Sequence, residues 1–164
     1  MERRSRKQGS GIGPEVLRGI WRLKRVWRRG QRSAAGLNSA LLRSLSASLT
    51  IIPDSDENQL ILMNSIQLGA LELRFEGHGR LQGPRPLLMF QFDRLILKLG
   101  QRELLVRSLP HPQPLKQPFF ALISAYRTNS GDSVNPRGNG VDWLAARGRS
   151  GGIALWELEV SQPC

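Results

Sequence analysis

The most suggestive chemical pattern in the chain is a short glycine-rich stretch, residues 148–152, which reads Gly-Arg-Ser-Gly-Gly. It matches the G-x-S-x-G pattern of a hydrolase nucleophile elbow, in which the serine follows a strand, precedes a helix and works with a downstream acid and histidine. Only twelve residues follow, none is histidine, and residues 153–160 have the pattern of a strand. We therefore interpret Ser150 as a turn residue and not as a nucleophile.

Few other side chains could carry out acid–base chemistry or bind a metal ion. The two histidines, His78 and His111, lie in a glycine turn and between two prolines, with no acidic cluster beside either in the sequence. Asp54, Asp56 and Glu57 lie together in a polar turn, but the oxygen-ligand spacing of a calcium loop is absent. The sequence therefore predicts a protein that is not an enzyme and that uses neither a metal ion nor another cofactor.

Charge is the most unusual feature of the composition. The 164 residues are 40% hydrophobic and 23% charged, as expected for one globular domain. The net charge is +11, and residues 1–32 hold eleven basic and two acidic side chains, which is +9 of that total. This asymmetry predicts a nearly neutral body with a basic arm for anionic lipid, nucleic acid or an acidic protein. The residues that we expect to contact an anionic surface are Arg18, Arg22, Arg25, Arg28 and Arg29.

Targeting and redox signals are sparse. Cys164 is the only cysteine, which excludes an intrachain disulfide and is consistent with a reducing compartment. No stretch approaches the roughly 18 apolar residues of a membrane span, and the N-terminus lacks the apolar segment of a secretory signal. We therefore expect a soluble or peripheral protein.

The first 50 residues carry weak structural signals. We expect residues 1–13 to form a flexible basic tail. Residues 14–27 leave two alternatives open, because their apolar residues fit a basic amphipathic helix and also fit a strand that alternates with basic residues. Leucines at helical spacing in residues 37–49 predict a short helix.

From residue 59 onward the apolar residues recur with a period of two, with glycine and proline between the segments. Leu71, Leu73 and Phe75 alternate with charged residues, which is typical of a half-buried strand. In residues 88–99 the apolar face switches from even to odd positions, which predicts a β-bulge near residues 93–94. Eight or so short strands at this spacing indicate an all-β fold.

The predicted fold is an antiparallel, lipocalin-like β-barrel. We assign residues 14–160 to this single domain and residues 161–164 to a C-terminal tail.

Residues 144–155, which read Leu-Ala-Ala-Arg-Gly-Arg-Ser-Gly-Gly-Ile-Ala-Leu, resemble the closing motif of the plastid lipid-associated protein (PAP/fibrillin) family. In that family a strand carrying L-R-I-x-R-G is followed by a polar turn, a glycine and an apolar strand. Residues 19–23 look like the family's opening G-x-W-x-L strand, and residues 90–100 resemble its F-x-R-x-x-L-x-L-G-like strand. The positions that match the closing motif are Arg147, Gly148, Gly151, Ile153 and Leu155.

Physical reasoning adds a prediction about how such a barrel would close. An up-and-down barrel pairs its first strand with its last, so an arginine near the end of the chain could stack on a tryptophan near its start. We predict that Arg147 or Arg149 meets Trp21. Gly148 and Gly151 would permit a positive φ in the turn between the last two strands.

We expect the protein to bind an apolar small molecule or lipid without catalysis, as a monomer, with a basic arm that contacts anionic membrane. The resemblance implies a prenyl lipid or carotenoid at a thylakoid or plastoglobule, in a cyanobacterial-type cell or a plastid. The residues that we expect to face the lumen are Leu71, Leu73, Phe75, Phe90, Phe92, Phe119, Ala121 and Ile123.

Two alternatives stay open. A nucleic-acid-binding β-barrel would use the same basic residues, with aromatic side chains as stacking platforms. A scaffold or assembly factor would instead use the exterior of the barrel to bind a protein.

Overall fold

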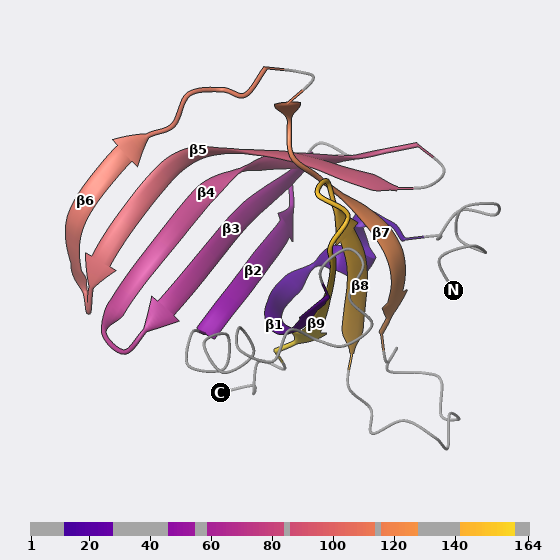
Figure 1. The fold of residues 1–164 in the computed structure, drawn as a ribbon, viewed down its shortest axis with the longest axis horizontal. Coiled ribbons are helices and arrows are strands. Elements are labelled where there is room, and N and C mark those ends of the chain that lie inside the picture. The colour runs from indigo at the N-terminus through magenta and orange to yellow at the C-terminus, as the bar shows by residue number, and fades with distance from the viewer. Residues whose placement is uncertain are drawn as a thin grey trace.

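The chain forms an antiparallel β-sheet that curls into a ring (Figure 1). The computed structural model describes residues 12–27, 46–54, 59–83, 86–113, 116–127 and 142–159. Within these residues there are nine strands and one short helix, which confirms the all-β fold. The elements are α2 (Pro14–Leu17), β1 (Gly19–Trp27), β2 (Ser46–Pro53), β3 (Gln59–Leu68), β4 (Leu71–Gln82), β5 (Leu87–Leu99), β6 (Arg102–Ser108), β7 (Phe119–Tyr126), β8 (Trp143–Gly148) and β9 (Ile153–Leu158).

Strand pairing brings the two ends of the sheet together. The order is β4-β3-β2-β1-β9-β8-β7-β5-β6, and β4 also pairs with β5. Eight strands therefore form a ring, while β6 pairs only with β5 and lies outside it. The first strand meets the last, with Trp21 opposite Leu158, as barrel closure requires.

The N-terminal segment that the sequence left ambiguous is a strand. Pro14 starts a single helical turn, where proline is well tolerated because the first helical N–H has no partner in any case. At Gly19, with φ +134°, the chain enters β1. Ile12 is only 7% exposed and belongs to the core, so the ordered body begins before the predicted boundary at residue 14. Residues 1–11 of the predicted tail lie outside the described residues.

The helix predicted for residues 37–49 is wrong where it can be compared. Residues 46–49 belong to β2, and residues 37–45 lie outside the described part of the chain. The leucine spacing fits a helix, but β2 lies between β1 and β3 and hydrogen-bonds to both. Leu49 and Ile51 are buried on one face of this strand. Sheet pairing and this burial override the weak local preference for a helix.

The predicted bulge in β5 is confirmed. The register between β4 and β5 shifts at Asp93, so that Glu76 pairs with Arg94 and Gly77 pairs with Phe92. A Cβ atom at Gly77 would collide with the backbone of Gln91, which explains the glycine opposite the bulge.

The bulge keeps one apolar row of β5 on the same face before and after it. Phe90 and Phe92 pair with Gly79 and Gly77, and beyond the bulge Leu95 and Leu97 continue on that face. The far ends of β3, β4 and β5 extend beyond the ring and carry β6 at their edge (Figure 1).

One end of the ring, which we call the closed end, is filled by side chains. It holds the start of β1, the end of β2 and the start of β3, since Gly19 pairs with Ile51 and Pro53 pairs with Leu60. The side chains packed there, each 0% exposed, are Leu17, Trp21, Ile51 and Leu60. The opposite halves of the same strands surround the candidate site.

Candidate ligand-binding cavity

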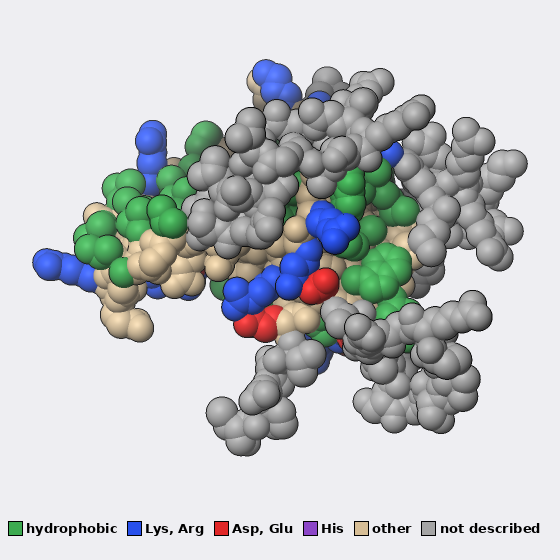
Figure 2. Space-filling model, turned by 60° about the horizontal axis from the view of Figure 1, so that its bottom comes forward, with side chains coloured by type: hydrophobic (Ala, Val, Ile, Leu, Met, Phe, Trp, Pro, Cys, Tyr) green, Lys and Arg blue, Asp and Glu red, His purple; other side chains and the backbone are tan. Residues whose placement is uncertain are grey.

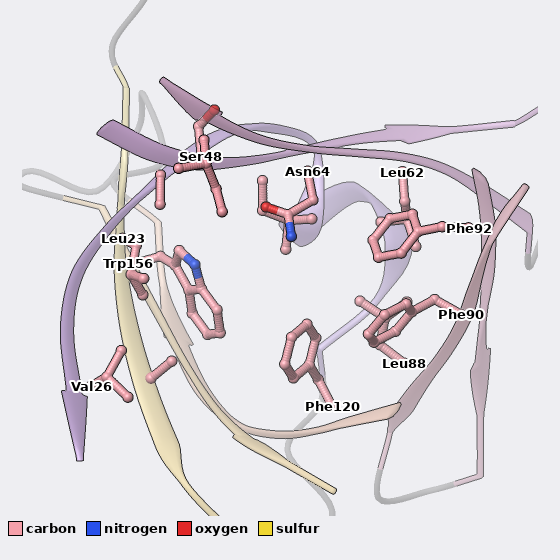
Figure 3. A pocket seen from close by; sticks show the side chains of 14 residues that line it. Leu23, Val26, Ser48, Leu62, Asn64, Leu88, Phe90, Phe92, Phe120 and Trp156 are labelled. Carbon is pink, nitrogen blue, oxygen red and sulfur yellow. The ribbon is translucent and has the colours of Figure 1, made fainter. Parts of the chain in front are cut away.

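The interior of the ring opposite the closed end contains a cavity of about 360 Å³ (Figure 3). Six strands contribute to it, and twelve of its fourteen lining side chains are apolar. The lining residues are Leu23, Val26, Ala47, Ser48, Leu49, Leu62, Asn64, Ile66, Leu88, Phe90, Phe92, Phe120, Ala154 and Trp156. None of the lining residues is charged, so the site suits a neutral, largely apolar molecule.

Aromatic rings form one continuous wall of the cavity. The ring centroids lie 5.4 Å apart for Phe90 and Phe92, 5.0 Å for Phe90 and Phe120, and 5.5 Å for Phe120 and Trp156. These are favourable separations for tilted and edge-on pairs, which stabilise the wall without filling the space.

The floor of the cavity is fixed by the closed end. Trp21 lies beside Leu49 in the β1–β2 pairing, and its indole N–H donates a 2.7 Å hydrogen bond to the Leu17 carbonyl. The Arg127 guanidinium lies 5.7 Å from the centre of the Trp21 ring. Both the ring and the N–H of Trp21 therefore have a partner within the protein.

The two polar side chains in the lining differ from each other in their partners. Ser48 hydrogen-bonds to the Ser65 hydroxyl at 2.9 Å. The side-chain amide of Asn64 makes no hydrogen bond within the described part of the chain. The same is true there of the Trp156 indole N–H, although Trp156 is only 6% exposed. Figure 3 shows both side chains reaching into the cavity, with the indole nitrogen of Trp156 on the side toward Asn64.

The structure places the expected lumen residues in three groups. Phe90 and Phe92 line the cavity. Leu71, Leu73 and Phe75 lie on the same face of the sheet, since Leu73 pairs with Ile66 and Phe75 with Asn64, but they are beyond the lining. Phe75 lies next to Phe92, with 5.5 Å between the ring centroids.

The prediction for β7 assigned the wrong face to Phe119 and Ala121. These two residues flank Phe120, which lines the cavity and pairs with the lining residue Leu88, so they lie on the other face of the strand. Ile123 lies where the register between β7 and β8 shifts, and it is not among the lining residues. The run from Phe119 to Ile123 is apolar throughout, so its hydrophobicity contains no alternation from which the inner face could be read.

The turn between β8 and β9 has the predicted positive φ at Gly151 but not at Gly148, and it does not make the predicted contact. Gly151 has φ +86°, the Gly151 N–H donates to the Gly148 carbonyl at 2.9 Å, and exposed Ser150 lies within this turn. Arg147 donates to the Gly151 carbonyl at 2.6 Å and Arg149 to the Gln117 carbonyl at 3.0 Å.

The expected contact of Arg147 or Arg149 with Trp21 is therefore wrong, and Arg127 takes that place. The reason is register, because Arg147 pairs with Ile153 at one end of β9, whereas Trp21 pairs with Leu158 at the other.

The two histidines, which have no acidic cluster beside them in the sequence, both contact the bulge residue Asp93. The His78 Nδ1 atom lies 2.7 Å from one Asp93 oxygen, and the His111 Nδ1 atom lies 3.4 Å from the other. Asp93 Oδ1 also accepts a hydrogen bond from Gln91. This cluster is exposed and lies outside the cavity lining, where it ties the segment after β6 to the bulge. Among the described residues no group of three or more His, Cys, Asp or Glu is placed to hold a metal ion.

The arginines of the expected basic arm are only partly described. Arg22 forms a 2.6 Å ion pair with Glu159, and this hydrogen bond raises the pKa of the Arg22 guanidinium. Arg18 lies 3.6 Å from Glu15, and Arg25 is exposed. Arg28 and Arg29 lie outside the described residues.

Comparisons with known proteins add no family. Neither the models of known protein families nor the curated proteins include a match to this chain. In the described part of the chain, no helix has the length and apolar character needed to cross a membrane.

Proposed function

We propose that the protein binds a neutral, largely apolar small molecule of lipid type in this cavity and does not transform it. The observation that carries the proposal is the lining itself, which combines twelve apolar side chains with no charged one around a space of about 360 Å³. Ligand sites in proteins have this character and occupy about 300–1,000 Å³. A cavity at the small end of this range would enclose only one end of a long prenyl lipid or carotenoid, the ligands that the PAP/fibrillin resemblance implies.

Filling the cavity tests this proposal directly. Ala154 lines the cavity, whereas Ala145 lies on the opposite face of β8 from its buried neighbours Leu144 and Ala146. We expect Ala154→Phe to abolish binding of the neutral fluorescent probe N-phenyl-1-naphthylamine, and Ala145→Phe to leave it unchanged. Both variants would be checked for native circular dichroism. Equal probe binding by the two variants would contradict the proposal.

Native mass spectrometry of the protein purified from its own cells addresses the natural ligand. A co-purifying neutral lipid is the expected result. An empty protein that binds RNA with a steep salt dependence would instead favour the nucleic-acid alternative.

The second part of the proposal is that the protein meets its ligand at a lipid surface. Where the sheet extends beyond the ring, Leu73 of β4 pairs with Ile66 of β3 and Leu97 of β5, and Leu97 pairs with Leu105 of β6. This apolar row starts at Ile66 in the cavity lining and ends at Leu105, which is 49% exposed. Leu99, which lies beside the row, is 52% exposed. Figure 2 shows hydrophobic side chains gathered on this projecting part, with Lys and Arg at its tip.

An exposed apolar surface beside basic groups suits an anionic membrane. We expect Leu105→Glu to reduce co-flotation with vesicles of phosphatidylcholine and phosphatidylglycerol. Ile52→Glu is the matched control, because Ile52 is 43% exposed on β2 within the ring and the substitution adds the same charge. If both variants float like the wild type, this surface does not contact lipid, and the cavity proposal is unaffected.

A further inference from the structure

We propose that Asn64 and Trp156 form a polar anchor that selects ligands carrying a neutral carbonyl oxygen. This inference rests on the proposed function, because it names the chemical class of ligand that the same cavity takes. It starts from the hydrogen-bonding state of the two side chains in an otherwise apolar lining.

The Trp156 indole is an unusual buried donor. Buried indole N–H groups usually find an acceptor, and the Trp21 indole does so at the Leu17 carbonyl. Trp156 is 94% buried, and its N–H donates to no residue in the described ranges. An indole N–H is a donor only, so the partner that it lacks must be an acceptor.

Asn64 provides a second polar group in the lining, on the side toward which the Trp156 indole nitrogen lies (Figure 3). It lies in β3 between Leu49 of β2 and Phe75 of β4, both apolar, at a position where leucine would suit the surrounding lining. Its amide offers both donor hydrogens and an acceptor oxygen. A carbonyl oxygen has two lone pairs, so one ligand oxygen can accept from both the amide and the indole.

The absence of charge in the site determines whether it binds a neutral or an anionic ligand oxygen. No lysine or arginine lines the cavity, so a carboxylate or phosphate would lose its hydration without gaining a counter-charge. A ketone, aldehyde, ester or quinone avoids this cost. The aromatic wall formed by Phe90, Phe120 and Trp156 further favours a planar group beside that carbonyl.

A pair of nearly isosteric probes isolates the anchor from general apolar binding. 2-Acetylnaphthalene and 2-ethylnaphthalene differ only by a carbonyl oxygen, and 2-naphthoate replaces the acetyl group with a carboxylate. Water solvates the ketone better than the hydrocarbon, so tighter binding of the ketone must come from hydrogen bonds in the site. We expect the ketone to displace N-phenyl-1-naphthylamine about tenfold more strongly, equivalent to about 1.4 kcal/mol, and the carboxylate not to displace it.

The variant Asn64→Leu should reduce this preference. We expect it to favour the ketone by less than tenfold, because only the Trp156 N–H remains as a donor, while it keeps or improves the binding of 2-ethylnaphthalene. Gln67→Leu is the control, because it makes the same kind of change on an exposed part of β3. Retention of the tenfold preference in Asn64→Leu would overturn the role of Asn64.

The indole N–H gives an independent readout. In a ¹H–¹⁵N spectrum, with the Trp156 signal assigned from Trp156→Phe, the ketone should shift this signal downfield and the hydrocarbon should not. The Trp21 signal serves as an internal reference, since its hydrogen bond to Leu17 is already made. Equal affinity for both neutral probes with no downfield shift would overturn the anchor and leave the proposed function standing. If neither probe displaces the dye, the proposed function itself fails.

Discussion

The two ends of the ring use a buried tryptophan in different ways. At the closed end Trp21 is 0% exposed, donates to the Leu17 carbonyl and lies under the Arg127 guanidinium. At the cavity Trp156 is 6% exposed and stacks edge-on against Phe120, but its N–H has no acceptor among the described residues. The comparison teaches that burial alone does not separate a core residue from a binding residue. The two are separated by whether the indole N–H finds its hydrogen-bond acceptor within the protein.

The largest effect expected from this comparison is on stability. Trp21→Ala should lower the free energy of unfolding by about 3–5 kcal/mol, because it leaves a void in a filled core and an unpaired Leu17 carbonyl. Trp156→Ala should cost at least about 1 kcal/mol less, since one side of its ring already borders a cavity. Urea unfolding followed by circular dichroism measures both values. Equal losses would mean that the two ends are packed alike.

Sequence reasoning recovered the parts of this architecture that follow an alternating pattern. The strand character of β4 and the bulge at Asp93 could be predicted, because charged residues separate Leu71, Leu73 and Phe75 and because the apolar face of β5 changes parity. The inner face of β7 could not be predicted, since residues 119–123 are all apolar.

The residues that distinguish the candidate site were missed. Trp156 and Asn64 are single residues in strands of ordinary pattern, and no local signal marks an unpaired donor. Which side chains meet at the cavity depends on contacts far apart in the sequence, since Asn64 of β3 and Trp156 of β9 line the same space. Asn64, a polar residue that stands at strand spacing between Leu62 and Ile66 in the sequence, was the one available hint.

The second prediction concerns stability without ligand. Asn64→Leu should raise the free energy of unfolding of the empty protein by about 1 kcal/mol, because it removes a partly buried amide that lacks a protein partner. Ser48→Ala should have the opposite sign and cost about 1 kcal/mol, since it breaks the hydrogen bond to Ser65. Thermal unfolding of the two variants distinguishes a group reserved for a ligand from a structural one. Destabilisation by Asn64→Leu would assign Asn64 to the structural class.

The third prediction tests which arginine secures the closed end. Arg127→Ala should cost about 1 kcal/mol, because it removes the cation over Trp21, a 2.8 Å hydrogen bond to the Arg18 carbonyl and a 3.7 Å ion pair with Asp142. It should also shift the Trp21 indole signal. Arg147→Ala is the control and should leave that signal in place, because Arg147 lies at the other end of β9. A shift in the control alone would restore the contact expected from the sequence.

The smallest effect is expected at the surface of the closed end, where Arg22 pairs with Glu159 at 2.6 Å. The Arg22 side chain is 47% exposed, so solvent screening limits the contribution of the pair to less than about 1 kcal/mol.

The pKa of the Arg22 guanidinium is raised in the folded state, first by the hydrogen bond to Glu159. A raised basic pKa gives stability that is fully present below the unfolded pKa and is lost only as the pH rises through the folded value. The stability contributed by the raised Arg22 pKa should therefore be constant from pH 6 to pH 9, because both pH values lie far below the range in which arginine loses its proton. The difference in unfolding free energy between Arg22→Ala and the wild type, measured at these two pH values, should be the same. A difference that shrinks between them would show that another titrating group, and not the arginine, sets the strength of this pair.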